Sequence, residues 1–138
     1  MPFNKFVLDT NIWVSFFIKA KFDALVTIIL DNDLSVYTSQ TLIDELTEVL
    51  SRKKFAKYLT LPIQEYVAFH SSLTILIETE ALYQSSPDPK DNFLFDLAFK
   101  TNCEALVTGD KKLLELDSID NVAIITLSDF LTMYQTRN

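Results

Sequence analysis

Short apolar runs alternate along the chain with longer segments in which apolar residues recur at helical spacing. Runs such as Phe6-Val-Leu8 are bounded by polar or turn residues, which is typical of buried strands. The pattern predicts strands over residues 5–8, 34–37, 73–77, 105–108 and 122–126. It predicts a turn at 85–89 and helices over residues 11–18, 22–30, 39–53, 62–71, 91–102 and from 128 onward.

This alternation favours an α/β fold of three layers, in which a parallel sheet of about five strands lies between helices. With 138 residues, 49% of them apolar, the chain is expected to form a single domain over residues 1–138. Ligands of open α/β sheets bind at the carboxyl ends of the strands, near the point where the strand order reverses. A strand order of 3-2-1-4-5 would place the first and fourth strands side by side.

Two aspartates follow these two strands. Asp9 ends the first strand, and Asp110 follows the fourth across Gly109. If the two strands are neighbours, their carboxylates meet at one edge of the sheet. Structural roles are the alternative, with Asp9 as the N-cap of the next helix and Asp110 as a turn residue.

Three scarce residue types exclude several classes of site. With one glycine, the chain cannot form a GxGxxG or a GxxxxGK[ST] phosphate-binding loop. With His70 and Cys103 as the one histidine and the one cysteine, disulfide frameworks and zinc clusters are excluded, and any nucleophilic triad would have to use His70. Carboxylates are plentiful: 19 acidic against 12 basic residues give a net charge of −7. We therefore expect carboxylate chemistry with hard metal ions, and not nucleic-acid binding by bulk charge.

The helix predicted over residues 39–53 carries acids in two different positions. At about 100° per residue, its apolar residues form one stripe, and Glu45 lies at the edge of this stripe. Asp44 and Glu48 point away from the stripe and are expected to face water. Glu45 is therefore the acid of this helix that can reach into a cleft.

The helix predicted over residues 91–102 begins with an acid on its apolar face. Asp91 shares the direction of the apolar residues, whereas Asp96 and Lys100 lie together on the opposite side, which predicts a surface ion pair. Asp88 precedes a proline and is expected to cap the helix. Asp91 could close a capping box with Asp88, or it could serve a site, because a helix amino terminus favours the ionised carboxylate.

Together these acids resemble the PIN-domain family of metal-dependent nucleases, and within it the short bacterial toxins of toxin–antitoxin pairs (VapC-like). The resemblance covers nearly the whole chain. Four motifs carry it: Val7-Leu-Asp-Thr-Asn-Ile12, Thr41-Leu-Ile-Asp-Glu45, Pro87-Asp-Pro-Lys-Asp-Asn92 and Leu106-Val-Thr-Gly-Asp110.

The resemblance implies a 3-2-1-4-5 parallel sheet and hydrolysis of single-stranded RNA with one or two Mg²⁺ or Mn²⁺ ions. It implies that the catalytic, metal-binding acids are Asp9, Glu45, Asp91 and Asp110. It makes Asn11 and Thr108 hydrogen-bond partners at the site, and Asp96 falls where some relatives carry a further acid. It also implies a small antitoxin protein as a partner and a homodimer.

Basic residues near these acids are candidates for guiding the RNA backbone, although they could also form solvated helix ends. They are Arg52, Lys53, Lys54, Lys57, Lys111 and Lys112. The chain has neither a signal-peptide apolar region nor an apolar stretch long enough for a membrane span. Its single cysteine fits a reducing compartment, so we expect a cytoplasmic protein that does not enter membranes.

Other functions compete with nuclease activity. Phosphoryl transfer to Asp9, as in haloacid-dehalogenase-like phosphatases, needs a second acid where Asn11 stands. A receiver-like phospho-acceptor needs an aspartate after the third strand, which ends in Ile77-Glu78. A PIN-like module that binds RNA or protein without turnover is the third alternative, and the four intact acids argue against it.

Overall fold

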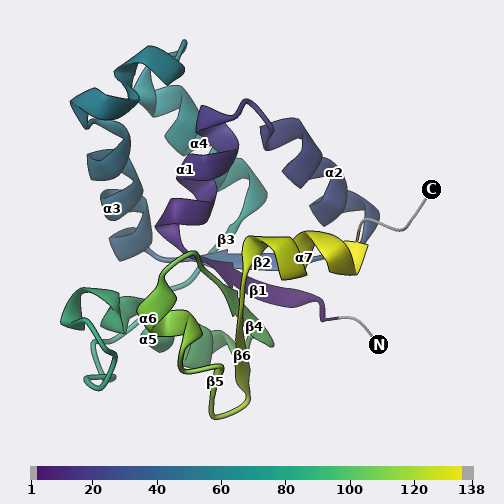
Figure 1. Ribbon diagram of the computed structural model, residues 1–138, viewed down its shortest axis with the longest axis vertical. Helices are drawn as coiled ribbons and strands as arrows, with labels where there is room; N and C mark the ends of the chain where they lie inside the picture. The colour runs from purple at the N-terminus through teal and green to yellow at the C-terminus, as the bar shows by residue number, and fades with distance from the viewer. Residues whose placement is uncertain (1–2, 135–138) are drawn as a thin grey trace.

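The computed structural model describes residues 3–134 and contains one sheet, with strand order β3-β2-β1-β4-β6-β5 (Figure 1). Neighbouring strands are parallel, except that β5 is antiparallel to β6. The strands are β1 (Lys5–Leu8), β2 (Ser35–Thr38), β3 (Ile75–Leu76), β4 (Ala105–Val107), β5 (Ser118–Ile119) and β6 (Val122–Ile125). The predicted 3-2-1-4-5 order is confirmed, with β6 as the fifth predicted strand and β5 as an unpredicted edge strand.

Helices cover both faces of the sheet, which confirms the three-layer α/β prediction. In Figure 1, α1, α2 and α4 lie above the sheet and α5 and α6 below it. Helix α5 contacts β1, β2 and β4, whereas α3 contacts α1, α4 and α5. The helices are α1 (Thr10–Ile18), α2 (Phe22–Asp31), α3 (Gln40–Leu50), α4 (Ile63–Leu73), α5 (Asn92–Thr101), α6 (Lys111–Leu114) and α7 (Leu127–Tyr134), with 3₁₀ helices η1 (Lys53–Tyr58) and η2 (Pro89–Asp91).

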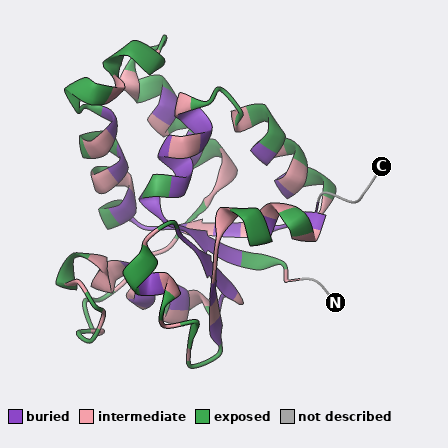
Figure 2. Cartoon of the chain, viewed as in Figure 1, coloured by how far each residue is buried: buried purple, intermediate pink, exposed green. Residues whose placement is uncertain are grey.

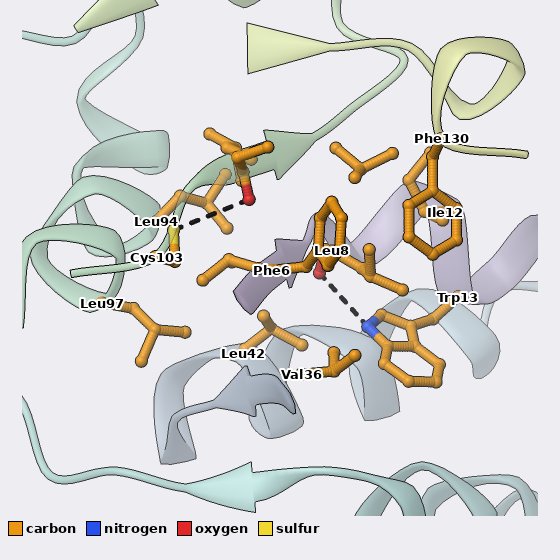
Figure 3. Close-up of a cluster of buried hydrophobic side chains, with 14 of the residues drawn as sticks. Phe6, Leu8, Ile12, Trp13, Val36, Leu42, Leu94, Leu97, Cys103 and Phe130 are labelled. Atoms are coloured by element: carbon orange, nitrogen blue, oxygen red, sulfur yellow. Dashed lines mark hydrogen bonds between the residues drawn. The ribbon is translucent and has the colours of Figure 1, made fainter. Parts of the chain in front are cut away.

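The core is built around β1 and β4, in which every residue except Lys5 is buried (Figure 2). Phe6 of β1 meets Phe130 of α7 edge to face, with ring centroids 4.9 Å apart. Trp13 of α1 is fully buried, and its indole N–H donates to the Leu8 carbonyl over 3.2 Å (Figure 3). Burying each large side chain of this kind contributes about 1.5–3 kcal/mol. The ends of β1 and β4 are therefore fixed in a rigid setting.

His70 of α4 is fully buried, so a triad open to substrate cannot be built on it. Its ring lies 4.3 Å from the Trp13 ring, and its Nε2 is 2.9 Å from the Thr38 hydroxyl. Burial lowers the pKa of His70 to about 4, so the imidazole is neutral at pH 7. His70 therefore links α4 to α1 and β2 as a packing residue.

Burial likewise raises the pKa of the Cys103 thiol to about 12, so this cysteine is an inert core residue.

Several element boundaries differ from the prediction. Helix α3 ends at Leu50 and not at residue 53, because Arg52 adopts an extended conformation with ψ 138°. The Ser51 hydroxyl donates to the Thr47 carbonyl over 2.7 Å at this end, and the chain continues as η1. The predicted strand 73–77 shrinks to Ile75–Leu76, because α4 continues through Leu73. Among the described residues, no helix combines the length and apolar character needed to cross a membrane.

Candidate active site

A cleft of about 530 Å³ opens at the carboxyl ends of β1 and β4. Its lining includes all four acids of the sequence motifs, and each comes from a different part of the fold: Asp9 follows β1, Glu45 projects from α3, Asp91 ends η2, and Asp110 precedes α6. The structure therefore brings the four candidate acids to one cleft, and their role there stays a prediction.

Asp9 lies deepest, with 6% of its surface exposed. Its N–H donates to the Val107 carbonyl over 2.9 Å, which extends the β1–β4 pairing by one residue. Carboxylate Oδ1 accepts the Thr10 N–H at 2.7 Å, and Oδ2 accepts the Thr108 hydroxyl at 2.8 Å. Burial raises the pKa of Asp9 to about 6, helped by the negative charge of neighbouring carboxylates and opposed by these two hydrogen bonds.

Asn11 and Thr108 join the two strand ends. The Asn11 amide donates to Asp9 Oδ2 over 3.3 Å and accepts the Gly109 N–H over 3.2 Å. The Thr108 hydroxyl donates to Asp9 and accepts the Asp110 N–H over 3.0 Å. Both predicted partners therefore contact Asp9 directly and fix the turn that carries Asp110.

Two of the acids also cap helices, which is the alternative role weighed for Asp9, whereas the alternative weighed for Asp110 is that of a turn residue. Asp9 caps α1 through its bond from Thr10 N–H, and Asp110 caps α6 by accepting the Lys112 N–H at 2.8 Å. Helix amino termini stabilise negative charge, so these bonds favour the ionised form that a metal ligand needs. Capping and a role in the cleft are therefore compatible.

Glu45 is held by a residue that the sequence analysis did not identify. The buried Thr10 hydroxyl donates a short hydrogen bond to Glu45 Oε1. Thr10 thus contacts two of the four acids, Asp9 through its N–H and Glu45 through its side chain. A hydroxyl residue directly after the strand-end aspartate is visible in the sequence, but its partner depends on the packing of α1 against α3.

Replacing Thr10 with valine removes this hydroxyl and keeps the side-chain shape and the backbone N–H. We expect Mn²⁺ affinity, measured by titration calorimetry, to fall by about 10- to 100-fold, the usual cost of losing a partner of a ligating side chain. Thr10→Ser keeps the hydroxyl and should retain most of the affinity. Equal affinities for the valine and serine variants would show that the Thr10–Glu45 bond does not position the acid.

Asp91 stands at the start of α5, and its carboxylate makes no capping hydrogen bond to that helix. Asp88 acts as the predicted cap, accepting the Lys90 N–H at 3.0 Å, so the capping box with Asp91 is not formed. Burial, together with the negative charges of Asp9, Asp110, Asp88 and Glu45, raises the pKa of Asp91 to about 7. A cation in the cleft would relieve this repulsion.

Asp96 is not brought into this cleft, and its predicted ion pair with Lys100 is wrong. Its Oδ1 accepts the N–H groups of Leu82 and Tyr83 at 3.0 and 2.7 Å, which fastens the preceding loop to α5. Two backbone donors satisfy the carboxylate without a cation. Within residues 3–134, the ion pair that forms joins Arg52 to Glu48.

The predicted basic residues divide into two groups. Arg52 and Lys54 line the cleft, together with Lys19, which the sequence analysis did not identify. The remaining candidates do not line it; they are Lys53, Lys57, Lys111 and Lys112.

The chemistry of the four acids fits a divalent metal. Carboxylate oxygens are the ligands that Mg²⁺ and Mn²⁺ prefer, and Mg²⁺ typically takes only one or two of them and keeps several waters. Within residues 3–134, no three acid, imidazole or thiol side chains already stand close enough to hold one ion. Like charges repel, and the oxygens are turned toward Thr10, Thr108 and the Lys112 N–H. Binding one ion through three of these side chains therefore requires them to rotate.

The comparisons with known proteins agree with this fold. A chain in the crystal structure of VapBC2 from Rickettsia felis, bound to a DNA fragment from their promoter, has a similar fold, with a TM-score of 0.62. The two chains are 20% identical, and the match covers 88% of this chain and 98% of that chain. No curated protein matches the sequence. The PIN domain family model matches residues 5–112, which include all four acids, and the chain therefore belongs to the PIN domain family.

Proposed function

We propose that the protein is a metal-dependent endoribonuclease that hydrolyses phosphodiester bonds of single-stranded RNA. The observation that carries this proposal is the gathering of four carboxylates from four parts of the chain in one cleft. Membership of a family whose members are generally nucleases supports it. Phosphoryl transfer to Asp9 is less favoured, because Asn11 stands where that chemistry needs a second acid.

Each residue has a separate task in this reaction. The four acids would hold a Mg²⁺ or Mn²⁺ ion, which when bound would supply a water molecule of lowered pKa and positive charge at the phosphate. Asp9 and Asp110 present oxygens from the rigid strand ends, and Thr108 and Asn11 keep Asp9 in orientation. Glu45 and Asp91 close the site from α3 and α5.

The toxin component of a toxin–antitoxin pair is the biological role that we infer, and the structural similarity to VapBC2 supports it. In this role the protein would be neutralised by a small antitoxin protein, form a homodimer and act in the cytoplasm. A short reading frame directly upstream of the gene would support this role, and its absence would weaken it.

Metal removal tests the nuclease proposal. Single-stranded RNA incubated with the protein and Mn²⁺ or Mg²⁺ should be cleaved, EDTA should abolish cleavage, and excess Mn²⁺ should restore it, as followed on denaturing gels. Cleavage that persists in EDTA would contradict the mechanism. Tight RNA binding without cleavage would favour a binding module.

A further inference from the structure

The cleft has a basic end as well as an acidic one. Its lining follows one face of α1 through Thr10, Val14 and Ile18, at helical spacing, and continues to Lys19 at the C-cap. Opposite, it follows α3 from Glu45 through Val49 and onward to Arg52. The two helices contact each other and lie side by side as they leave the sheet toward η1 (Figure 1). The cleft is therefore a groove along both helices.

The acidic and basic ends of the groove lie far apart along the two helices. At about 1.5 Å per residue, Ile18 lies roughly 12 Å along α1 from Thr10, and Leu50 lies roughly 8 Å along α3 from Glu45. Lys19 and Arg52 follow just beyond these two helix ends. A phosphate held at the acids is thus distant from the backbone of these basic residues. The next phosphates of the same strand are the groups that the basic end can contact.

Two of the three basic residues carry charge that is not already paired. Arg52 forms a two-point contact with Glu48 on α3, with Nη2 and Nε 2.9 and 3.4 Å from the carboxylate oxygens. Lys19 and Lys54 form no ion pair within residues 3–134. The Lys54 ammonium lies 5.1 Å from the centroid of the Phe55 ring, a contact that keeps it beside the groove.

We propose, on the basis of the nuclease function proposed above, that Lys19 and Lys54 form a phosphate-binding subsite for the RNA strand on one side of the cleaved bond. The ligand is the phosphodiester backbone of a single-stranded polynucleotide running along the groove between α1 and α3. In a chain of net charge −7, a local pair of ammonium groups attracts the negatively charged phosphates, which the acidic end repels. Among the described residues, the basic side chains that line the groove lie at this end, so nucleotides on that side of the cleaved bond contribute more to binding than those on the other.

Matched double variants test this subsite, because both remove two lysines and give the same net charge. Lys19→Ala with Lys54→Ala removes the two unpaired lysines of the basic end and leaves Arg52, whereas Lys53→Ala with Lys57→Ala removes exposed lysines of η1 that do not line the groove. Binding of a fluorescent single-stranded RNA is measured by anisotropy over a range of salt concentrations, with Ca²⁺ in place of the catalytic ion and RNA integrity checked on gels. Thermal unfolding of both variants shows whether the lysines merely stabilise helix ends.

We expect the Lys19/Lys54 variant to bind RNA at least about tenfold more weakly. The slope of its logarithmic binding constant against the logarithm of salt concentration should fall by the amount that about two phosphate contacts contribute. The Lys53/Lys57 variant should stay near the wild type. The subsite would be overturned if both variants lost RNA affinity equally, if the loss were explained by unfolding, or if the wild type bound no RNA. Lysine-dependent binding without cleavage in Mn²⁺ would contradict the nuclease function and leave the subsite in place.

Discussion

Replacing Asp9 with asparagine is expected to lower the rate of RNA cleavage by at least about 100-fold. The variant removes a charged ligand of the metal ion, and the ion stabilises the transition state by several kcal/mol. The same change should leave the free energy of unfolding unchanged or raise it. At pH 7 the ionised Asp9 is destabilising, because burial raises its pKa from 3.8 to about 6. Asparagine removes that buried charge and keeps the side-chain shape. Cleavage assays and urea unfolding of the metal-free protein measure the two effects.

Asp44→Asn is the matched control, because Asp44 is exposed on the outer face of α3 and bonds only to Gln40 among the described hydrogen bonds. Its activity should match the wild type. Undiminished cleavage by Asp9→Asn would contradict the proposed mechanism. A large loss of stability in that variant would show instead that Asp9 serves as a structural cap.

The affinity for Mn²⁺ is expected to fall on the order of 100- to 1,000-fold between pH 8 and pH 5. Ligating carboxylates must lose their protons, and the pKa values of Asp91 and Asp9 are raised to about 7 and about 6 without metal. Below pH 7 the ion competes with one proton, and below pH 6 with two. Titration calorimetry at four pH values measures this dependence. A constant affinity across this range would exclude Asp9 and Asp91 as ligands.

The same pKa values set the pH dependence of stability. Both carboxyls hold their protons more tightly in the folded protein than in the unfolded chain. Their contribution to stability is therefore present below pH 4 and is lost as the pH rises to about 7. Bound metal replaces the protons, so its stabilising effect is largest above pH 7.

The strands and the candidate acids could be predicted because they depend on local pattern, whereas the 3-2-1-4-5 strand order is implied by the resemblance to PIN domains. Apolar runs identify strands, and parallel strands place their following residues, such as Asp9 and Asp110, at one edge. Helical spacing is equally local, so Glu45 could be separated from Asp44 before the fold was known. Local pattern therefore identifies Asp9, Asp110 and Glu45 as candidates, whereas the metal-binding role of the four acids is what the resemblance to PIN domains implies.

The features that the sequence did not reveal depend on contacts between distant segments. Thr10 bonds to Glu45 only because α1 packs on α3, and Lys19 reaches the groove for the same reason. Asp96 and Lys100 have the spacing of an ion pair, but the loop at Leu82 returns over α5 and supplies backbone donors instead. A charge pattern alone cannot reveal that backbone N–H groups bond to Asp96 in place of Lys100.

The most direct test of the account is a crystal of the protein grown with Mn²⁺ and measured for the anomalous signal of manganese. We expect a peak in the cleft, about 2–2.3 Å from a carboxylate oxygen of Asp9 and from at least one other of the four acids. That peak should be missing for Asp9→Asn under the same conditions. A peak elsewhere, or an empty cleft at saturating Mn²⁺, would contradict the claim that these carboxylates form a metal-dependent catalytic site.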